Sequence, residues 1–244
     1  MLGQEFGSSM ISKSESIYPL LNSPENLYSR SEINLDFSKH QLCDVIAFER
    51  FKDVIPQLSN LESLSMNLKD FELTPSDCAQ LGNLLPVLPK LRELRLRNFL
   101  IGLNNINKFK ELMLNLHKIS NLTGFHFINK HYEINPEIIY ILCKATERMN
   151  KLEKFSSQYT HYKKHLLEYE INYLIKTIAK LPNLQTLNLN LNNLTRSALF
   201  FPTLRNHLKE AKRLKHLNID IREFYAISKD DLAYIIQLLK NMSF

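Results

Sequence analysis

The stretch LPNLQTLNLNLNNL, residues 181–194, contains six leucines in fourteen positions. Leu184, Leu187, Leu189 and Leu194 follow one another at intervals of three, two and five residues. An amphipathic helix repeats its apolar residues every three or four positions, and a half-buried strand repeats them at every second position. The intervals therefore indicate a short strand joined to a segment of another kind.

The first part of this pattern, apolar-x-x-apolar-x-apolar, recurs along the chain. Copies begin at Leu61, Leu91, Leu122, Leu152, Leu184 and Leu214, with a weaker copy at Arg30. Successive starts are separated by 31, 30, 31, 30, 32 and 30 residues, and Ser157 fills the last apolar slot of the copy at Leu152. So regular a period predicts a repeat architecture for residues 30–244.

Each repeat contains a strand and a helix. The alternating residues predict a strand with one buried face, and the remainder has helical spacing, as in residues 106–119 and 136–149. Pro75-Ser76-Asp77 and Asn135-Pro136-Glu137 carry the residue types that begin helices. Pro202 marks a further helix that starts at or near it.

One such unit cannot bury its apolar face alone, but stacked units can. We therefore predict an α/β solenoid, a curved right-handed superhelix of about seven repeats of 30–32 residues. Its strands form a parallel sheet on the concave face, and its helices cover the convex face. Residues 1–29 do not fit the period, so we expect an N-terminal tail and a cap over the first repeat, followed by the repeat domain at 30–244.

The best copy, L184QTLNLNLNNL, resembles the leucine-rich repeat consensus LxxLxLxxNxL at every defined position. The chain is similar to leucine-rich repeat proteins of the ribonuclease-inhibitor-like type, which have a full helix on the convex side. The consensus Asn is present only at Asn192, and other residues occupy the equivalent slots: Ser38, Lys69, Phe99, Lys130, Thr160 and Arg222. In the family this Asn bonds the turn after the strand, so the resemblance implies differently satisfied turns here.

The composition, rich in Asn, Lys and Ile, is also similar to small leucine-rich repeat effectors that intracellular bacteria such as Legionella deliver into host cells. That similarity implies a virulence effector that acts on a host protein. We accordingly expect a cytoplasmic location, in the host cell if the effector resemblance holds.

Side chains between the repeated apolar residues are expected on the concave face, in two rows. The first row is Asn34, Ser65, Arg95, His126, Ser156, Asn188 and Asn218. The second row is Asp36, Asn67, Arg97, Ile128, Gln158, Asn190 and Asp220. Arg95, Arg97 and His126 predict a small cationic patch in the middle of the sheet.

The position after each strand is occupied by Phe37, Leu68, Asn98, Asn129, Tyr159, Leu191 and Ile221, and we expect these residues to rim the concave surface. Because Arg and Tyr often dominate interfaces, and solenoids bind partners on this face, we predict a partner-binding surface. Its candidate residues are Asn67, Arg95, Arg97, His126, Gln158, Tyr159, Asn188 and Asn190. A solvated polar sheet is the alternative.

A second function is suggested by charge. The chain has 31 Lys and Arg against 25 Asp and Glu, a net charge of +6, and Arg205–Lys215 is a basic stretch. This stretch could bind an anionic membrane or a nucleic acid, although a solvated helix end is the simpler interpretation.

No catalytic motif is recognised, so we predict a binding protein without enzymatic activity, cofactor, metal or small-molecule substrate. We also expect the protein to be a monomer. Three widely spaced cysteines form no disulfide or zinc pattern. Cys78 and Cys143 fall in apolar helical segments, where burial makes a thiol inert.

Overall fold

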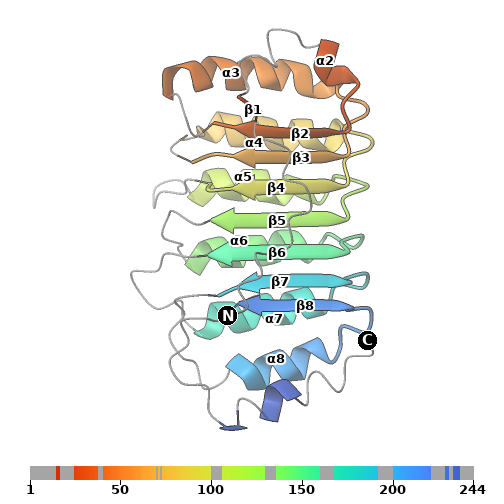
Figure 1. The fold of residues 1–244 in the computed structure, drawn as a ribbon. Coiled ribbons are helices and arrows are strands. Elements are labelled where there is room, and N and C mark those ends of the chain that lie inside the picture. The colour runs from red at the N-terminus through yellow and green to blue at the C-terminus, as the bar shows by residue number, and fades with distance from the viewer. Residues whose placement is uncertain are drawn as a thin grey trace, which may run out of the picture.

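In the computed structural model, a single sheet is backed by a row of helices (Figure 1). The structure describes residues 15–16, 25–37, 41–69, 71, 73–99, 106–129, 136–159, 168–191, 200–220, 229–230 and 233–236. The consensus residue Asn192 lies outside these described residues.

The sheet has eight described strands, all parallel and ordered as in the chain. They are β1 Glu15–Ser16, β2 Glu32–Asp36, β3 Ser63–Asn67, β4 Glu93–Arg97, β5 Gly124–Asn129, β6 Lys154–Tyr159, β7 Thr186–Asn190 and β8 His216–Asp220. The alternating residues of each repeat thus form the strands, as predicted.

Equivalent positions of successive repeats lie side by side in the sheet. Leu94 of β4 pairs with Leu64 of β3 on one side and with Phe125 of β5 on the other. In the same row, Phe155 of β6 pairs with Leu187 of β7. The register therefore has no slip from β2 to β8, and the apolar residues of each strand continue the apolar rows of its neighbours. A slip of one residue would turn these side chains to solvent.

The helices lie together on one face of the sheet (Figure 1). They are α2 Glu25–Tyr28, α3 Gln41–Val54, α4 Pro75–Leu84, α5 Ile106–Leu116, α6 Pro136–Thr146, α7 Glu168–Ala179 and α8 Phe200–Leu208, with short 3-10 helices η1 Ile55–Gln57 and η2 Leu85–Val87. A helix is about 10–12 Å wide whereas strands lie about 4.8 Å apart, so the helical side must be the outer one. The predicted α/β leucine-rich repeat solenoid is confirmed.

The core lies between sheet and helices, and aromatic rings fill its middle. The Phe127 ring lies 5.4 Å from Phe109 of α5 and 6.2 Å from Tyr159 of β6, measured between ring centroids. Phe125 and Phe155 continue the next buried row. Ser157, in the apolar slot of its repeat, is buried, and its hydroxyl has no hydrogen-bond partner among the described residues.

Helix α4 begins where the sequence predicts, because local hydrogen bonds satisfy its first turn. The Thr74 hydroxyl accepts a hydrogen bond from the Asp77 amide, and the Asp77 carboxylate accepts one from the Thr74 amide. Asp77 also lies 2.9 Å from Lys52 Nζ of α3, a side chain that is only 5% exposed. This ion pair ties two successive helices together.

In the turns that lead from helix to strand, one position alternates between asparagine and a basic residue from repeat to repeat. The residue before the first slot is Asn60, Lys90, Asn121, Lys151, Asn183 and Arg213 in successive repeats. Each asparagine donates to a carbonyl of the preceding turn, at 3.3 Å to Tyr28, 2.8 Å to Pro89 and 2.8 Å to Asn150. Lys90 and Arg213 then donate to the side-chain oxygens of Asn60 and Asn183. These bonds link neighbouring repeats outside the core.

We expect Asn183→Ala to lower the free energy of unfolding by about 1 kcal/mol, because it removes both the bond to Asn150 and the acceptor of Arg213. Urea unfolding followed by circular dichroism would measure the change. Ser120→Ala, at an exposed position of another turn, is the control and should leave stability unchanged. Equal stability of wild type and Asn183→Ala would show that the inter-repeat bonds contribute nothing.

Part of the region before residue 30 joins the solenoid. Strand β1 pairs with β2, and Leu27 of α2 is buried in the core. The boundary between cap and repeats at residues 29 and 30 stays a prediction. Within the described part of the chain, no helix combines the length and apolar character needed to span a membrane.

Candidate functional site

The sheet face carries the two predicted rows in register. Arg95 lies between Ser65 and His126, and Arg97 lies between Asn67 and Ile128. A third row, two residues earlier on each strand, lies on the same face because strand residues alternate. Its members are Glu32, Ser63, Glu93, Gly124, Lys154, Thr186 and His216. We did not predict this row, although the same alternation could have identified it.

Glu93 is the residue of that row that changes the site most. Its Oε1 lies 2.5 Å from Arg95 Nη2 and 3.0 Å from His126 Nε2. The first contact is an ion pair with a hydrogen bond, whereas His126 Nε2 has only the distance and not the alignment of a hydrogen bond. The three side chains form a compact cluster, so Arg95 is already paired within the protein.

The pKa of the Glu93 carboxyl is lowered to about 2 from 4.5, because His126 and then Arg95 favour its charged form, against the opposing effect of burial. The folded protein thus keeps this carboxylate ionised where the unfolded chain takes up a proton. Glu93 therefore stabilises the fold above about pH 4.5, and this contribution is lost as the pH falls towards 2.

We expect Glu93→Gln to lower the free energy of unfolding by about 1–2 kcal/mol at neutral pH. This value allows for solvent screening, because the pair of Glu93 and Arg95 is partly exposed. The difference from wild type should shrink as the pH is lowered from above 4.5 towards 2. Urea unfolding at several pH values would measure it. A difference that stays constant over this range would contradict the ionised Glu93 cluster.

Arg97 differs from Arg95 because no carboxylate among the described residues forms an ion pair with its guanidinium. Its Nε is buried and has no hydrogen-bond partner among the described residues. Burial and then the neighbouring charge of Arg95 lower its pKa from the ordinary value, while Asp36 opposes this effect. Arg97 is therefore a partly desolvated cation with a donor left to satisfy.

Asn67, beside Arg97, is part of an internal network. Its amide nitrogen donates to Asp36 at 3.0 Å, and its oxygen accepts from the Asn98 side chain at 2.9 Å and from the Lys69 amide at 3.3 Å. Asn98 has a left-handed backbone, φ 51°, which Asn tolerates better than most residues. These asparagines help to satisfy the turns after β3 and β4, where the consensus Asn is absent. Asn67 has little capacity left for a partner.

Two further candidate residues are also engaged within the sheet. Asn190 is only 5% exposed and donates to Asp220 at 3.0 Å. We predicted that Asn190 would be open to a partner, and that is wrong, because the side chain is enclosed beside Asp220. Asn188 donates to Ser156 at 3.1 Å but remains half-buried, as does Gln158.

The predicted rim of the concave surface is wrong. The described members of that row are buried: Phe37, Leu68, Asn98, Asn129, Tyr159 and Leu191. Tyr159 is 0% exposed and packs on Phe127, because it lies two residues beyond Ser157 and so shares the buried face of β6 with Ser157 and Phe155. Tyr159 cannot contact a partner in this conformation.

The sheet face is not basic as a whole. Its three rows contain Lys154, Arg95 and Arg97 against four acidic residues, Glu32, Asp36, Glu93 and Asp220. With histidines neutral, the net charge is −1. The predicted cationic patch is thus reduced to Arg97 and the partly neutralised Arg95, since Glu93 offsets one positive charge.

Exposed aromatic side chains lie on the helical face instead. Tyr140 of α6 is 50% exposed and stacks on Tyr173 of α7 at 5.6 Å, and Tyr169 of α7 is 75% exposed. Lys144 lies over both stacked rings. These contacts join two neighbouring helices.

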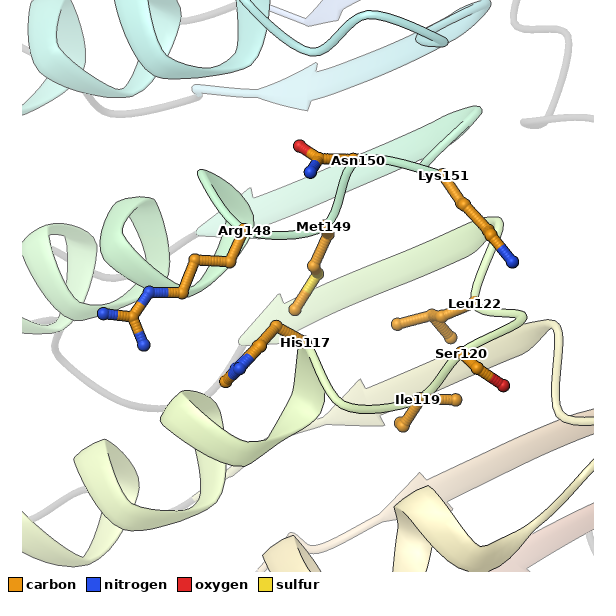
Figure 2. A pocket seen from close by; sticks show the side chains of 8 residues that line it. All are labelled: His117, Ile119, Ser120, Leu122, Arg148, Met149, Asn150 and Lys151. Atoms are coloured by element: carbon orange, nitrogen blue, oxygen red, sulfur yellow. The ribbon is translucent and has the colours of Figure 1, made fainter.

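A small open cavity of about 150 Å³ lies between the turns after α5 and α6 (Figure 2). Its apolar lining includes Met149, Ile119 and Leu122. Arg148 and Lys151 point away from each other in Figure 2, so their charges do not converge on one point. The geometry offers no focus for binding a small anion or for catalysis.

Comparisons with known proteins find only distant structural similarities. No protein-family model and no characterised protein matches the sequence. Similar solved structures include actin-binding site 2 of leiomodin-1, 13% identical over 68% of this chain and 92% of that one, with a TM-score of 0.46. The tropomodulin C-terminal domain from Caenorhabditis elegans is 13% identical over 81% and 93%, with a TM-score of 0.39. Rad7, in the yeast complex with Elc1, is 16% identical over 90% and 60%, with a TM-score of 0.47. We infer no function from similarities at this level.

Proposed function

We propose that this protein is a non-enzymatic interaction scaffold whose sheet face binds a partner protein. The observation that carries the proposal is Arg97, a half-buried and partly desolvated cation on the sheet face. A partner's carboxylate would pair with the exposed part of this guanidinium in a charge-assisted hydrogen bond.

The neighbours of Arg97 suit a protein surface. Ile128 lies beside it on β5 and Gln158 beside Ile128 on β6, both half-buried. A cation, an apolar group and an amide thus follow one another across three strands, about 4.8 Å apart. A partner segment with an acidic and an apolar residue would match them. Arg95 and His126, held by Glu93, border this strip.

Site-specific photocrosslinking tests the proposal. A photoreactive amino acid at Gln158 places the reactive group on the sheet face, and the same amino acid at Lys176, an exposed position of α7, is the matched control. We expect a covalent partner from Gln158 in lysate of the relevant cell, identified by mass spectrometry. Crosslinking of the same partner from Lys176 alone would place the interface on the helices and contradict the proposal.

We extend the proposal to a bacterial effector that binds a host protein in the host cytoplasm. The support is the compositional similarity to small effectors of intracellular bacteria, with the scaffold fold that such a role requires. A translocation reporter fused to the chain, expressed in an infecting bacterium, would test it. Reporter signal confined to the bacterium under conditions that deliver a known effector would contradict it.

Binding rather than catalysis also agrees with the cysteines. Cys78 and Cys143 are fully buried, as predicted, and burial raises the pKa of each thiol to about 12. Neither thiol provides a thiolate nucleophile at neutral pH.

A further inference from the structure

The positive charge of the chain is collected along one edge of the solenoid. We call this edge the turn edge, and it consists of the segments that lead from each helix into the next strand, seen in single file in Figure 1. These segments are residues 29–31, 58–62, 88–92, 117–123, 147–153, 180–185 and 209–215.

The turn edge contains eleven Lys and Arg against four Glu, a net charge of +7. The whole chain carries +6, so the remainder is net −1. All of these side chains are exposed except Arg30 and Glu153, which are half-buried. The basic stretch Arg205–Lys215 is therefore the end of a longer feature that spans all seven repeats.

The few acidic residues of the turn edge do little to reduce this charge. Glu147 pairs with Lys144 of α6 at 3.0 Å, so it neutralises a helix lysine. Glu62 lies in the turn before β3, far from the last turn of the edge. That last turn contains Lys209, Lys212 and Lys215 and a single acidic residue, Glu210. The α8–β8 turn therefore contains more net positive charge than any other turn of the edge.

The geometry and composition of the edge favour a broad anionic surface over a discrete ligand. Seven turns at the strand spacing of about 4.8 Å extend over about 29 Å. Seven of the eleven cations are lysines, which act as hydrated point charges, whereas arginine is favoured for bidentate phosphate recognition. The cavity between the turns after α5 and α6 does not focus its charges, as noted above.

We propose that the turn edge binds the surface of an anionic lipid bilayer. Polybasic segments are attracted to acidic headgroups without specific contacts, and each cation near the surface strengthens binding by a factor of about five. Single-stranded nucleic acid fits less well, because the seven turns contain no Phe, Tyr or Trp on which bases could stack. The edge is distinct from the sheet face, so a membrane-bound molecule could still hold its partner.

Vesicle co-sedimentation of the full chain tests this proposal. We expect binding to phosphatidylcholine vesicles only when they contain about one-third phosphatidylserine. Binding should fall steeply as salt is raised from about 0.1 M to about 1 M, because the Debye length shortens from about 10 Å to about 3 Å. Lys212→Glu/Lys215→Glu reduces the charge of the turn edge from +7 to +3 and should weaken binding about 25-fold or more.

Two further variants separate the turn edge from bulk charge. Lys118→Glu/Lys180→Glu changes other turns and should weaken binding comparably, which guards against local misfolding of one variant. Lys110→Glu/Lys176→Glu makes the same total charge change on exposed positions of α5 and α7, and should change binding less than about threefold. Unfolding curves would establish that each variant is folded.

Three results would overturn the proposal. The first is equal binding of the wild-type chain to vesicles with and without phosphatidylserine. The second is an equal loss of binding in the α5 and α7 variant. The third is displacement of the chain from vesicles by duplex DNA at equal charge concentration. The last result would assign the edge to nucleic acid. Arg97→Glu should bind vesicles like wild type, so failure of the sheet-face proposal and failure of this one remain distinguishable.

Discussion

Arg97→Glu is expected to weaken binding of the sheet-face partner about 30-fold or more, the scale of an interface residue worth at least about 2 kcal/mol. The side chain is a half-buried and partly desolvated cation, and the partner would supply a carboxylate to pair with it. Reversing the charge both removes the donor and repels an acidic partner group. Titration of the crosslinked partner by calorimetry or surface plasmon resonance would measure the affinity.

Arg95→Glu provides the informative comparison. Arg95 is held by Glu93, so it has less to gain from a partner, and we expect a smaller loss of affinity than at Arg97. Lys110→Glu on exposed α5 is the control for charge alone and should leave the affinity unchanged. Equal affinity of wild type and Arg97→Glu, with both folded, would move the binding site away from the middle of the sheet.

Phe127→Ala should have the largest effect on stability, a loss of about 3–5 kcal/mol of unfolding free energy. Phe127 is fully buried between Phe109 of α5 and Tyr159 of β6, so its removal leaves a cavity that both layers line. Because each repeat is stabilised by its neighbours, a defect in the middle repeats weakens the stack on both sides. Urea unfolding would measure the loss, and a loss below about 1 kcal/mol would contradict this packing.

Tyr159→Phe is the matched substitution for that experiment. The Tyr159 hydroxyl is buried close to the Ser157 hydroxyl, but the two are not aligned for a hydrogen bond, so removing it relieves a desolvation cost. We expect unchanged or slightly higher stability, by up to about 1 kcal/mol. We also expect unchanged partner affinity, since the ring does not reach the sheet face. A marked loss of affinity would show that Tyr159 leaves the core on binding.

The sequence indicates the fold clearly because the signal is repeated. One strand of five residues would be ambiguous, but seven copies at intervals of 30–32 residues each report the same buried face. Their alternation predicted the rows that contain Arg95 and Arg97, and the register of β2 to β8 confirms them. Helix starts at Pro75 and Pro136 followed from local capping chemistry.

The candidate site was predicted less well, because its properties depend on contacts between repeats. Alternation places a side chain on a face but does not show that Glu93 bonds Arg95, or that Asn190 is enclosed beside Asp220. The two-repeat alternation of Asn and basic residues was visible in the sequence. Its meaning required the structure, which brings residues about 30 positions apart into hydrogen-bond distance.

The sequence by itself determined the solenoid, the strand register and the identity of the side chains on the sheet, since these follow from local periodicity. Only the tertiary structure decided which of those side chains are available. It enclosed Asn190 beside Asp220, paired Arg95 with Glu93, and left Arg97 Nε without a hydrogen-bond partner among the described residues. It also placed the basic residues of seven separate turns on one edge. The physical reason is that periodicity fixes direction within a repeat, whereas burial, pairing and charge accumulation arise from stacking repeats against one another.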